Sequence, residues 1–265
     1  MGSAIGGRIK EKYQVIVFDK DTQKTVNLSG IKVAKDVIVL VSEVDVIILA
    51  VKPQDFEVVL NKIKDCVKDK LIISIAAGIT TGYIEKVLGK VRVVRVMPNI
   101  GVKIGAAESS LCKGGYSQDE DLNFTRELFN QVGKTWVIEE KMMNAATAIS
   151  GSGPAYIYYD LENNSTIDPL HVPDYKQNQY KEYLTKAAEK LGFDSSTALD
   201  LAACVTGTSL ALLTVTETPP KELRIMVTSP GGTTQAALEV LRAKGSWVEA
   251  ALAAKKRAEE LSVNL

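Results

Sequence analysis

Four short runs of apolar residues recur through the first half of the chain, and they restrict its fold more than any other feature. The runs are residues 15–18 (VIVF), 44–51 (VDVIILAV), 71–77 (LIISIAA) and 91–97 (VRVVRVM). Near-continuous runs of valine and isoleucine are typical of strands that are covered on both faces. The intervening segments 53–67 and 80–88 carry apolar residues at helical spacing. This alternation predicts an α/β fold with a doubly wound parallel sheet, which ends with a short strand at 136–138.

The pattern changes after about Lys141, and the second half of the chain is predicted to be all helical. Ser195 and Ser196 are candidate N-caps for a helix that runs to about Leu213 and is rich in small and apolar residues. Two further helices are expected, at 234–244 and 247–261.

We therefore expect two domains, residues 1–141 and residues 142–265. Residues 160–181 contain two prolines and three asparagines, so they should interrupt the helix that starts at Pro154. The helix ending near Leu213 is apolar nearly all round and should be buried. Because so small a helical domain offers little to cover it, we expect an intertwined dimer.

Composition narrows the possible chemistry. Lysine plus arginine equals aspartate plus glutamate at 32 each, which argues against nucleic acid or an anionic membrane as the main partner. The single histidine, His171, and the cysteines at 66, 112 and 204 offer no familiar metal-binding or catalytic spacing. No apolar run approaches the roughly 18 residues of a membrane span. We expect a cytoplasmic protein with no metal, whose chemistry comes from a bound organic cofactor.

Candidate cofactor residues lie at the ends of the predicted strands. Asp19 stands where a dinucleotide-binding fold places the carboxylate that accepts hydrogen bonds from the adenosine ribose, although a turn aspartate is the alternative. A Gly-x-Gly-x-x-Gly loop normally lies about 17–20 residues upstream, and Gly2 can supply only its last glycine. Residues 50–54 and 95–99 follow two other strands at the same sheet edge, where they contact a ligand or simply start a helix or a turn.

Residues 229–234 (SPGGTT) are the strongest candidate for a ligand site. Two glycines let the backbone approach a ligand, and the following helix presents N–H groups and the positive end of its dipole to a small carboxylate. The alternative is a plain helix cap. Residues 150–156 (SGSGPAY) are a candidate anion or cofactor site. The alternative is an interdomain hinge, and the two roles are compatible. Because neither motif contains a histidine or lysine base, they suit hydride transfer to a C=N bond that is already protonated.

Five motifs occur in the order found in the pyrroline-5-carboxylate reductase family, which the chain resembles over most of its length. They are AVKPQ (50–54), SIAAG (74–78), RVMPN (95–99), ISGSGPAY (149–156) and VTSPGGTT (227–234). This family reduces the cyclic imine 1-pyrroline-5-carboxylate to proline with NADH or NADPH. The resemblance implies a Rossmann-type domain followed by a helical dimerisation domain, with the active site near the subunit interface of a homodimer or higher oligomer.

The resemblance also implies roles for individual residues. Thr234 would hydrogen-bond the ring nitrogen of the substrate, and Glu217 is similar in position to a family glutamate near the substrate. The residues implied to bind the substrate are Ser229, Gly231, Gly232 and Thr233, and the backbone of the last three would hold its carboxylate. The residues implied to bind the cofactor are Gly2, Ser3, Ala4, Asp19, Lys20, Ala50, Lys52, Pro53, Met97 and Asn99.

Three features depart from the family pattern. The family's first strand and the first two glycines of its phosphate loop are missing, which leaves two strands with unpaired edges. A start assigned too late or a truncated product would explain this, and the chain should be poorly stable and bind cofactor weakly. Residues 160–181 are an insertion, either a surface loop or a gene-model error, and Ile100-Gly101 replaces the usual Thr-Pro.

Two questions stay open at this level. Asp19 would repel a 2′-phosphate and so favours NADH, although Lys20 could compensate. The incomplete phosphate loop also allows a non-catalytic dimeric homologue. A 3-hydroxyacid-type dehydrogenase is a further alternative, but Lys141 and Asn144 match the spacing of its catalytic pair only imperfectly.

Overall fold

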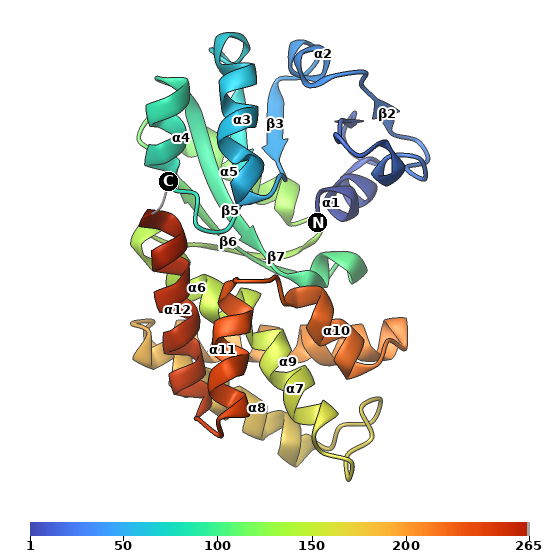
Figure 1. Cartoon of the computed structure of the whole chain (residues 1–265), viewed down its shortest axis with the longest axis vertical. Helices are drawn as coiled ribbons and strands as arrows, with labels where there is room; N and C mark the ends of the chain where they lie inside the picture. Colours follow the sequence, from blue (N-terminus) through green and yellow to red (C-terminus); the bar gives the residue numbers. More distant parts are fainter. Residues whose placement is uncertain (264–265) are drawn as a thin grey trace. The chain divides into compact units, whose positions relative to one another are not determined.

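A computed structural model describes residues 1–263, in which the chain forms two compact units (Figure 1). The first consists of residues 1–97 and 109–140 and contains the strands. The second consists of residues 98–108 and 141–263, and it is helical. Residues 98–108 therefore belong to the helical unit, although they lie within the sequence range of the first domain.

The strands form two sheets. β1 (Ile16–Val17) and β2 (Lys32–Val33) are a parallel pair, and a five-stranded sheet has the order β3 (Val46–Leu49), β4 (Leu71–Ser74), β5 (Arg92–Pro98), β6 (Ala107–Lys113), β7 (Gly133–Val137). β3, β4 and β5 are mutually parallel. β6 runs antiparallel to β5, because backbone hydrogen bonds join Asn99 to Glu108 at one end and Gly114 to Val93 at the other. The predicted Rossmann-type sheet is confirmed, and β2 and β6 are additions to it.

The two sheets divide at the place where a Rossmann-type sheet has its first strand. In the Rossmann order 3-2-1-4-5-6 that strand separates the equivalents of β1 and β3, and within residues 1–263 no strand lies between them. Residues 15–18, predicted to be a strand covered on both faces, are extended only at Ile16–Val17, which is half-buried, and Phe18 is 39% exposed. That detail of the prediction was wrong, because burial of such a run depends on a neighbouring strand.

Five α-helices accompany the strands of the first unit. They are α1 (Gly2–Ile9), α2 (Val37–Ser42), α3 (Pro53–Ile63), α4 (Thr81–Leu88) and α5 (Asp119–Phe129). Asp36 and Thr80 cap α2 and α4, because their side chains accept hydrogen bonds from the N–H groups of Val39 and Tyr83. The apolar residues at helical spacing in α3 are fully buried together with those of β4, and they form the core of this unit.

The second unit contains seven α-helices in the described part of the chain. They are α6 (Met143–Ala146), α7 (Gly153–Glu162), α8 (Asp174–Lys190), α9 (Ser195–Thr216), α10 (Pro220–Val227), α11 (Thr233–Arg242) and α12 (Trp247–Val263). Asp194, rather than Ser195 or Ser196, caps α9, since its carboxylate accepts a hydrogen bond from the Thr197 N–H at 3.0 Å. α10 was not predicted. Its two leading prolines resemble a turn, yet a proline at the first helical position also favours helix formation.

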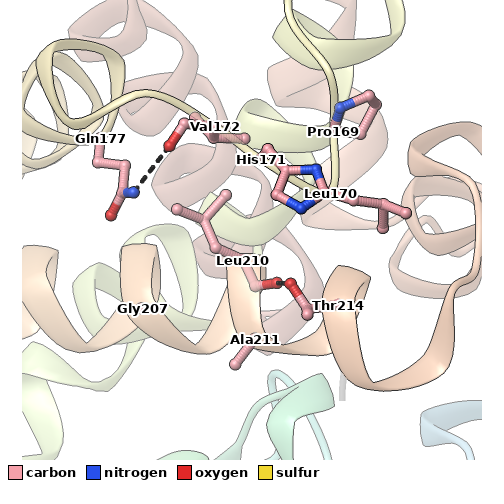
Figure 2. Close-up of a pocket in the computed structure, with 9 residues that line it drawn as sticks. All are labelled: Pro169, Leu170, His171, Val172, Gln177, Gly207, Leu210, Ala211 and Thr214. Carbon is pink, nitrogen blue, oxygen red and sulfur yellow. Dashed lines mark hydrogen bonds between the residues drawn. The ribbon is translucent and has the colours of Figure 1, made fainter.

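The interruption predicted at 160–181 is real but shorter, because only residues 163–173 lie outside a helix. α8 begins directly after Pro173 and extends through the polar end of the predicted insertion. Tyr180 explains why this polar end is helical. Its ring is fully buried and stacks on Trp247 at 5.6 Å between centroids, and its hydroxyl donates a hydrogen bond to Asp160. Figure 2 shows residues 169–172 of the interrupting segment beside α9, where they line a pocket of about 270 Å³.

α9 is less covered than its composition predicts. In the described part of the chain it is the one helix long and apolar enough to cross a membrane, although half of it is buried and a core helix of a soluble protein passes the same criterion. The expectation that no apolar segment approaches that length therefore needs correction. Leu199 is 56% exposed, and Ala203 and Gly207 are exposed on the same side of the helix.

Candidate active site

The N-terminus of α1 offers unpaired backbone donors. The first intrahelical hydrogen bond runs from Ile5 N to Met1 O at 3.1 Å, so the N–H groups of Gly2, Ser3 and Ala4 have no intrahelical acceptor in the described chain. A Cβ atom on Gly2 would lie 2.8 Å from the Cβ of Ala50, which no real contact allows. Close packing of helix on strand is the role of the third glycine of a phosphate loop. These residues therefore fit a bound phosphate group.

Asp19 lies two residues beyond β1, and its carboxylate is partly occupied. Oδ1 accepts a hydrogen bond from Asp21 N at 2.9 Å and lies 3.8 Å from the Lys24 ammonium. Lys20, in contrast, forms an ion pair with Asp55 at 2.7 Å. The cation beside Asp19 is thus Lys24, which the sequence did not single out, and not Lys20.

The remaining cofactor candidates lie at the ends of β3 and β5. Ala50 and Lys52 are exposed, and Lys52 is the N-cap of α3, in which Pro53 is the first residue. Met97, in β5, is half-buried. Asn99 is only 2% exposed, and its side-chain oxygen accepts hydrogen bonds from the backbone N–H groups of Gly101 and Glu108. Its visible role is to fix the turn between β5 and β6, and a cofactor contact stays a prediction.

In the helical unit, SPGGTT forms the N-terminus of α11. Gly232 is the N-cap, and Gly231 has a φ of +67°, a left-handed conformation that favours glycine. The Gly231 N–H is already bonded to Gln235 Oε1 at 2.8 Å and the Gly232 N–H to Ser229 O at 3.0 Å.

The free backbone donors of this turn therefore begin at Thr233, two residues later than the resemblance implies. Because the first intrahelical bond is from Ala236 N to Gly232 O, the N–H groups of Thr233 and Thr234 have no backbone acceptor in the described chain. The glycines shape the cradle, and the threonine N–H groups are the donors it presents.

Three hydroxyl groups meet beside this helix end. Thr234, only 4% exposed, donates a hydrogen bond to Ser152 Oγ at 3.1 Å, and the Thr233 hydroxyl lies 3.1 Å from the same oxygen. Ser152 is fully buried at the start of α7. The sequence marked the SGSGPAY motif but did not identify Ser152 as a site residue. The partners lie 81 and 82 positions apart, so no local signal could have revealed the contact.

Arg257 of α12 is a second residue that the sequence missed. Its Nε donates a hydrogen bond to Gly231 O at 2.7 Å, and its Nη1 pairs with Glu260 at 2.9 Å. The guanidinium holds the left-handed turn and brings positive charge to the carboxylate cradle. Glu217, at the C-terminus of α9, is exposed with a φ of +49°. In the described chain it makes no hydrogen bond or ion pair with residues 229–234, so its catalytic role stays a prediction.

Neither the cradle nor the hydroxyl cluster contains a thiol, an imidazole or a lysine. Burial raises the pKa of the Cys112 thiol to about 12, which removes it as a nucleophile. His171 lies on the segment beside α9, where its Nδ1 pairs with Asp168 at 2.7 Å. Burial also raises the pKa of Tyr156, one turn beyond Ser152, so its phenol stays protonated and donates to Ala148 O. The site can therefore bind an anion and orient a polar group, but it holds no general base.

A Rossmann-type unit combined with a helical unit that carries an anion cradle defines the class of nicotinamide-dependent oxidoreductases. Residues 1–78 match the family model described as NADP oxidoreductase, coenzyme F420-dependent, and residues 179–261 match pyrroline-5-carboxylate reductase dimerisation.

Individual relatives define the family. The chain is 36% identical to the pyrroline-5-carboxylate reductase of Methanosarcina acetivorans over 92% of this chain and 84% of that protein, and 35% identical to that of Pisum sativum over 82% and 74%. A Coxiella burnetii pyrroline-5-carboxylate reductase structure shares 30% identity with a TM-score of 0.63, over 98% and 94% of the two chains. The Plasmodium falciparum pyrroline carboxylate reductase with NADP bound has a TM-score of 0.62 at 26% identity, over 99% and 94%. The chain belongs to the pyrroline-5-carboxylate reductase family.

Proposed function

We propose that this protein reduces 1-pyrroline-5-carboxylate to L-proline with NADH or NADPH, as the last step of proline biosynthesis. The observation that carries the proposal is the hydroxyl cluster of the buried Ser152 and Thr234 and the half-buried Thr233. It lies at a helix N-terminus where the N–H groups of Thr233 and Thr234 have no backbone acceptor in the described chain. The named relatives support this activity, and none of them supports a non-catalytic homologue.

The α11 N-terminus binds the substrate carboxylate. The N–H group of Thr233 and the helix dipole attract the anion, and Arg257 adds positive charge next to Gly231. Gly231 and Gly232 contribute by shape, because they let the chain turn closely beneath the acid, with Ser229 on the other side of the turn. Glu217 stays a catalytic candidate on the resemblance alone.

Thr234 orients the ring nitrogen. The nitrogen of a protonated imine carries an N–H and so needs an acceptor, and the Thr234 oxygen is available because its own proton is directed to Ser152. A bound reduced nicotinamide would supply the hydride for the carbon of the C=N bond. The nitrogen keeps its proton and becomes an amine, so no side chain has to remove or deliver a proton at the reacting carbon.

The first unit holds the cofactor. The N–H groups of Gly2, Ser3 and Ala4 bind its phosphates. Lys52, Pro53 and Met97 are proposed for the nicotinamide side, and Ala50 and Asn99 are further cofactor candidates. Asp19 accepts hydrogen bonds from the ribose hydroxyls, which favours NADH over NADPH. Lys24, only 3.8 Å from Asp19, tempers the repulsion of a 2′-phosphate, whereas Lys20 is engaged with Asp55.

The active form is proposed to be a homodimer in the cytoplasm. The matched dimerisation family indicates an oligomer, and the exposed small and apolar face of α9 suits close helix contact, since a Cβ on Gly207 would meet no atom within 4 Å. Leu199→Glu should convert the dimer to monomer in size-exclusion chromatography with light scattering. Val58→Glu, at a similarly exposed apolar position in the first unit, should leave the dimer intact. An unchanged Leu199→Glu dimer would refute the use of this face.

The activity is tested by following nicotinamide absorbance with synthetic substrate and either NADH or NADPH. The chain is compared with a version extended at its N-terminus by a strand and a Gly-x-Gly sequence. We expect substrate-dependent oxidation of the cofactor, stronger in the extended version because two further glycines complete the phosphate loop. Absence of turnover in both versions, with folding verified by circular dichroism, would refute the proposal.

A further inference from the structure

Glu108 is a fully buried carboxylate to which the reaction above assigns no role. It lies at the start of β6, in the short segment 98–108 that belongs to the helical unit. Burying a carboxylate is costly unless hydrogen bonds or charges compensate for lost water. A glutamate at such a position therefore needs a structural or functional reason.

The carboxylate of Glu108 holds the SGSG turn. Ser150 Oγ donates a hydrogen bond to Glu108 Oε1 at 2.6 Å, which is within the range of charge-assisted hydroxyl–carboxylate bonds. Ser150 is itself only 1% exposed and lies in a π-helical turn, Thr147–Gly151, that directly precedes Ser152. π-helical turns are rare and occur frequently at functional sites.

The backbone of Glu108 is fixed as firmly as its side chain. Its N–H donates to the side-chain oxygen of Asn99 at 3.1 Å, and its carbonyl accepts from the Asn99 N–H at 3.0 Å. Two residues earlier, Ala106 O accepts a hydrogen bond from Thr208 of α9 at 2.8 Å. Glu108 therefore acts from a rigid support within the same unit as the hydroxyl cluster.

We propose that Glu108 is a positioning residue for the imine reduction, an inference that rests on the proposed function. By holding Ser150, Glu108 fixes the turn that places Ser152, and Ser152 in turn directs the proton of Thr234 away from the substrate nitrogen. Asn99, Glu108, Ser150, Ser152 and Thr234 form one continuous path from the end of β5 to the start of α11.

Four variants of the full chain test this proposal. Glu108→Met and Ser150→Ala each remove the hydrogen bond, from opposite sides. Glu108→Gln keeps an acceptor oxygen of the same reach. Ser110→Ala is the matched control, because Ser110 is equally buried in the same strand and its hydroxyl has no partner in the described chain.

In the kinetic assay, Glu108→Met and Ser150→Ala should lower kcat by about 10- to 100-fold, the usual effect of a small misplacement of a reacting group. KM for the nicotinamide should stay within about twofold, because cofactor binding is not touched. The double variant should be no worse than Glu108→Met alone, since both changes remove the same bond. Glu108→Gln should recover most of kcat, and Ser110→Ala should match the parent.

Hydrogen exchange of the peptide that contains residues 147–153, measured by mass spectrometry, gives a readout that does not depend on activity. Exchange should accelerate in Glu108→Met and Ser150→Ala but not in Ser110→Ala. Parental kcat in a folded Glu108→Met variant, additive losses in the double variant, or unchanged exchange would overturn the positioning role. If the parent itself has no turnover, the proposed reaction fails, and the exchange result still decides whether Glu108 holds the turn.

Discussion

Replacing the Thr234 hydroxyl is the most direct test of the proposed chemistry. Thr234→Val keeps the shape of a side chain that is 4% exposed and removes only its polar atom. Ser152 then loses one partner but keeps the Thr233 hydroxyl at 3.1 Å. The loss of one such bond costs about 1 kcal/mol of folding free energy, which lowers the Tm by roughly 2–4 °C in a protein of this size.

The effect on turnover should be much larger than the effect on stability. A hydrogen bond to a charged group contributes about 1.5–3 kcal/mol, so losing it from the transition state lowers kcat by roughly 10- to 150-fold. KM for NADH or NADPH should be unchanged, and Thr234→Ser, which keeps the hydroxyl, should retain most of kcat. Steady-state kinetics with thermal melts measure both effects. A folded Thr234→Val variant with parental kcat, or a Thr234→Ser variant equally defective, would refute the assignment.

Three further predictions concern the two binding sites. Gly231→Ala places a side chain at a φ of +67°, which strains the backbone by about 1–2 kcal/mol. The strained turn should raise KM for the imino acid more than it changes kcat. An unaltered KM would show that the turn does not bind the acid. Asp19→Ser removes a negative charge near the ribose, whose repulsion of another charge at 4 Å in water is about 1 kcal/mol. The ratio of kcat/KM with NADPH to kcat/KM with NADH should therefore rise roughly fivefold. An unchanged or lower ratio counts against the ribose contact. Gly2→Val forces a Cβ to 2.8 Å from that of Ala50 and should weaken cofactor binding in fluorescence titration, whereas parental affinity would contradict the phosphate site.

Buried strands made of apolar residues could be predicted from the sequence, and a buried strand that contains polar residues could not. β3, β4 and β5 appear in the sequence as continuous valine and isoleucine runs. β6 reads Ala-Glu-Ser-Ser-Leu-Cys-Lys, yet all but its last residue are buried. Glu108 is tolerated there because Ser150 supplies a hydrogen bond from a distant segment. Hydropathy records the preference of each residue for water, and it cannot record a partner that only the folded chain brings close.

The same reasoning separates the predicted part of the site from the rest. The SPGGTT motif identified the cradle because glycine and threonine before a helix carry local information about turns and caps. Ser152, Arg257 and Lys24 became visible only through tertiary contacts. The first free donor is also two residues later than expected, at Thr233, because Gln235 and Ser229 occupy the N–H groups of the two glycines. The motif therefore locates the anion site, and the hydrogen bonds in the structure show which N–H groups remain available as donors.

Two helix N-termini in this chain are candidate anion sites, and their side chains determine what each one binds. α1 and α11 both begin with N–H groups that lack backbone acceptors, so each attracts an anion. α1 begins with glycine, serine and alanine, and its Ser3 is exposed. These small residues suit a ligand whose phosphates bind the backbone N–H groups. α11 begins with two threonines that meet the buried Ser152, so an acid bound there also meets an oriented hydroxyl. Anion binding should therefore survive exchange of these hydroxyls, while orientation of the imine should not, which separates affinity from turnover within a single helix end.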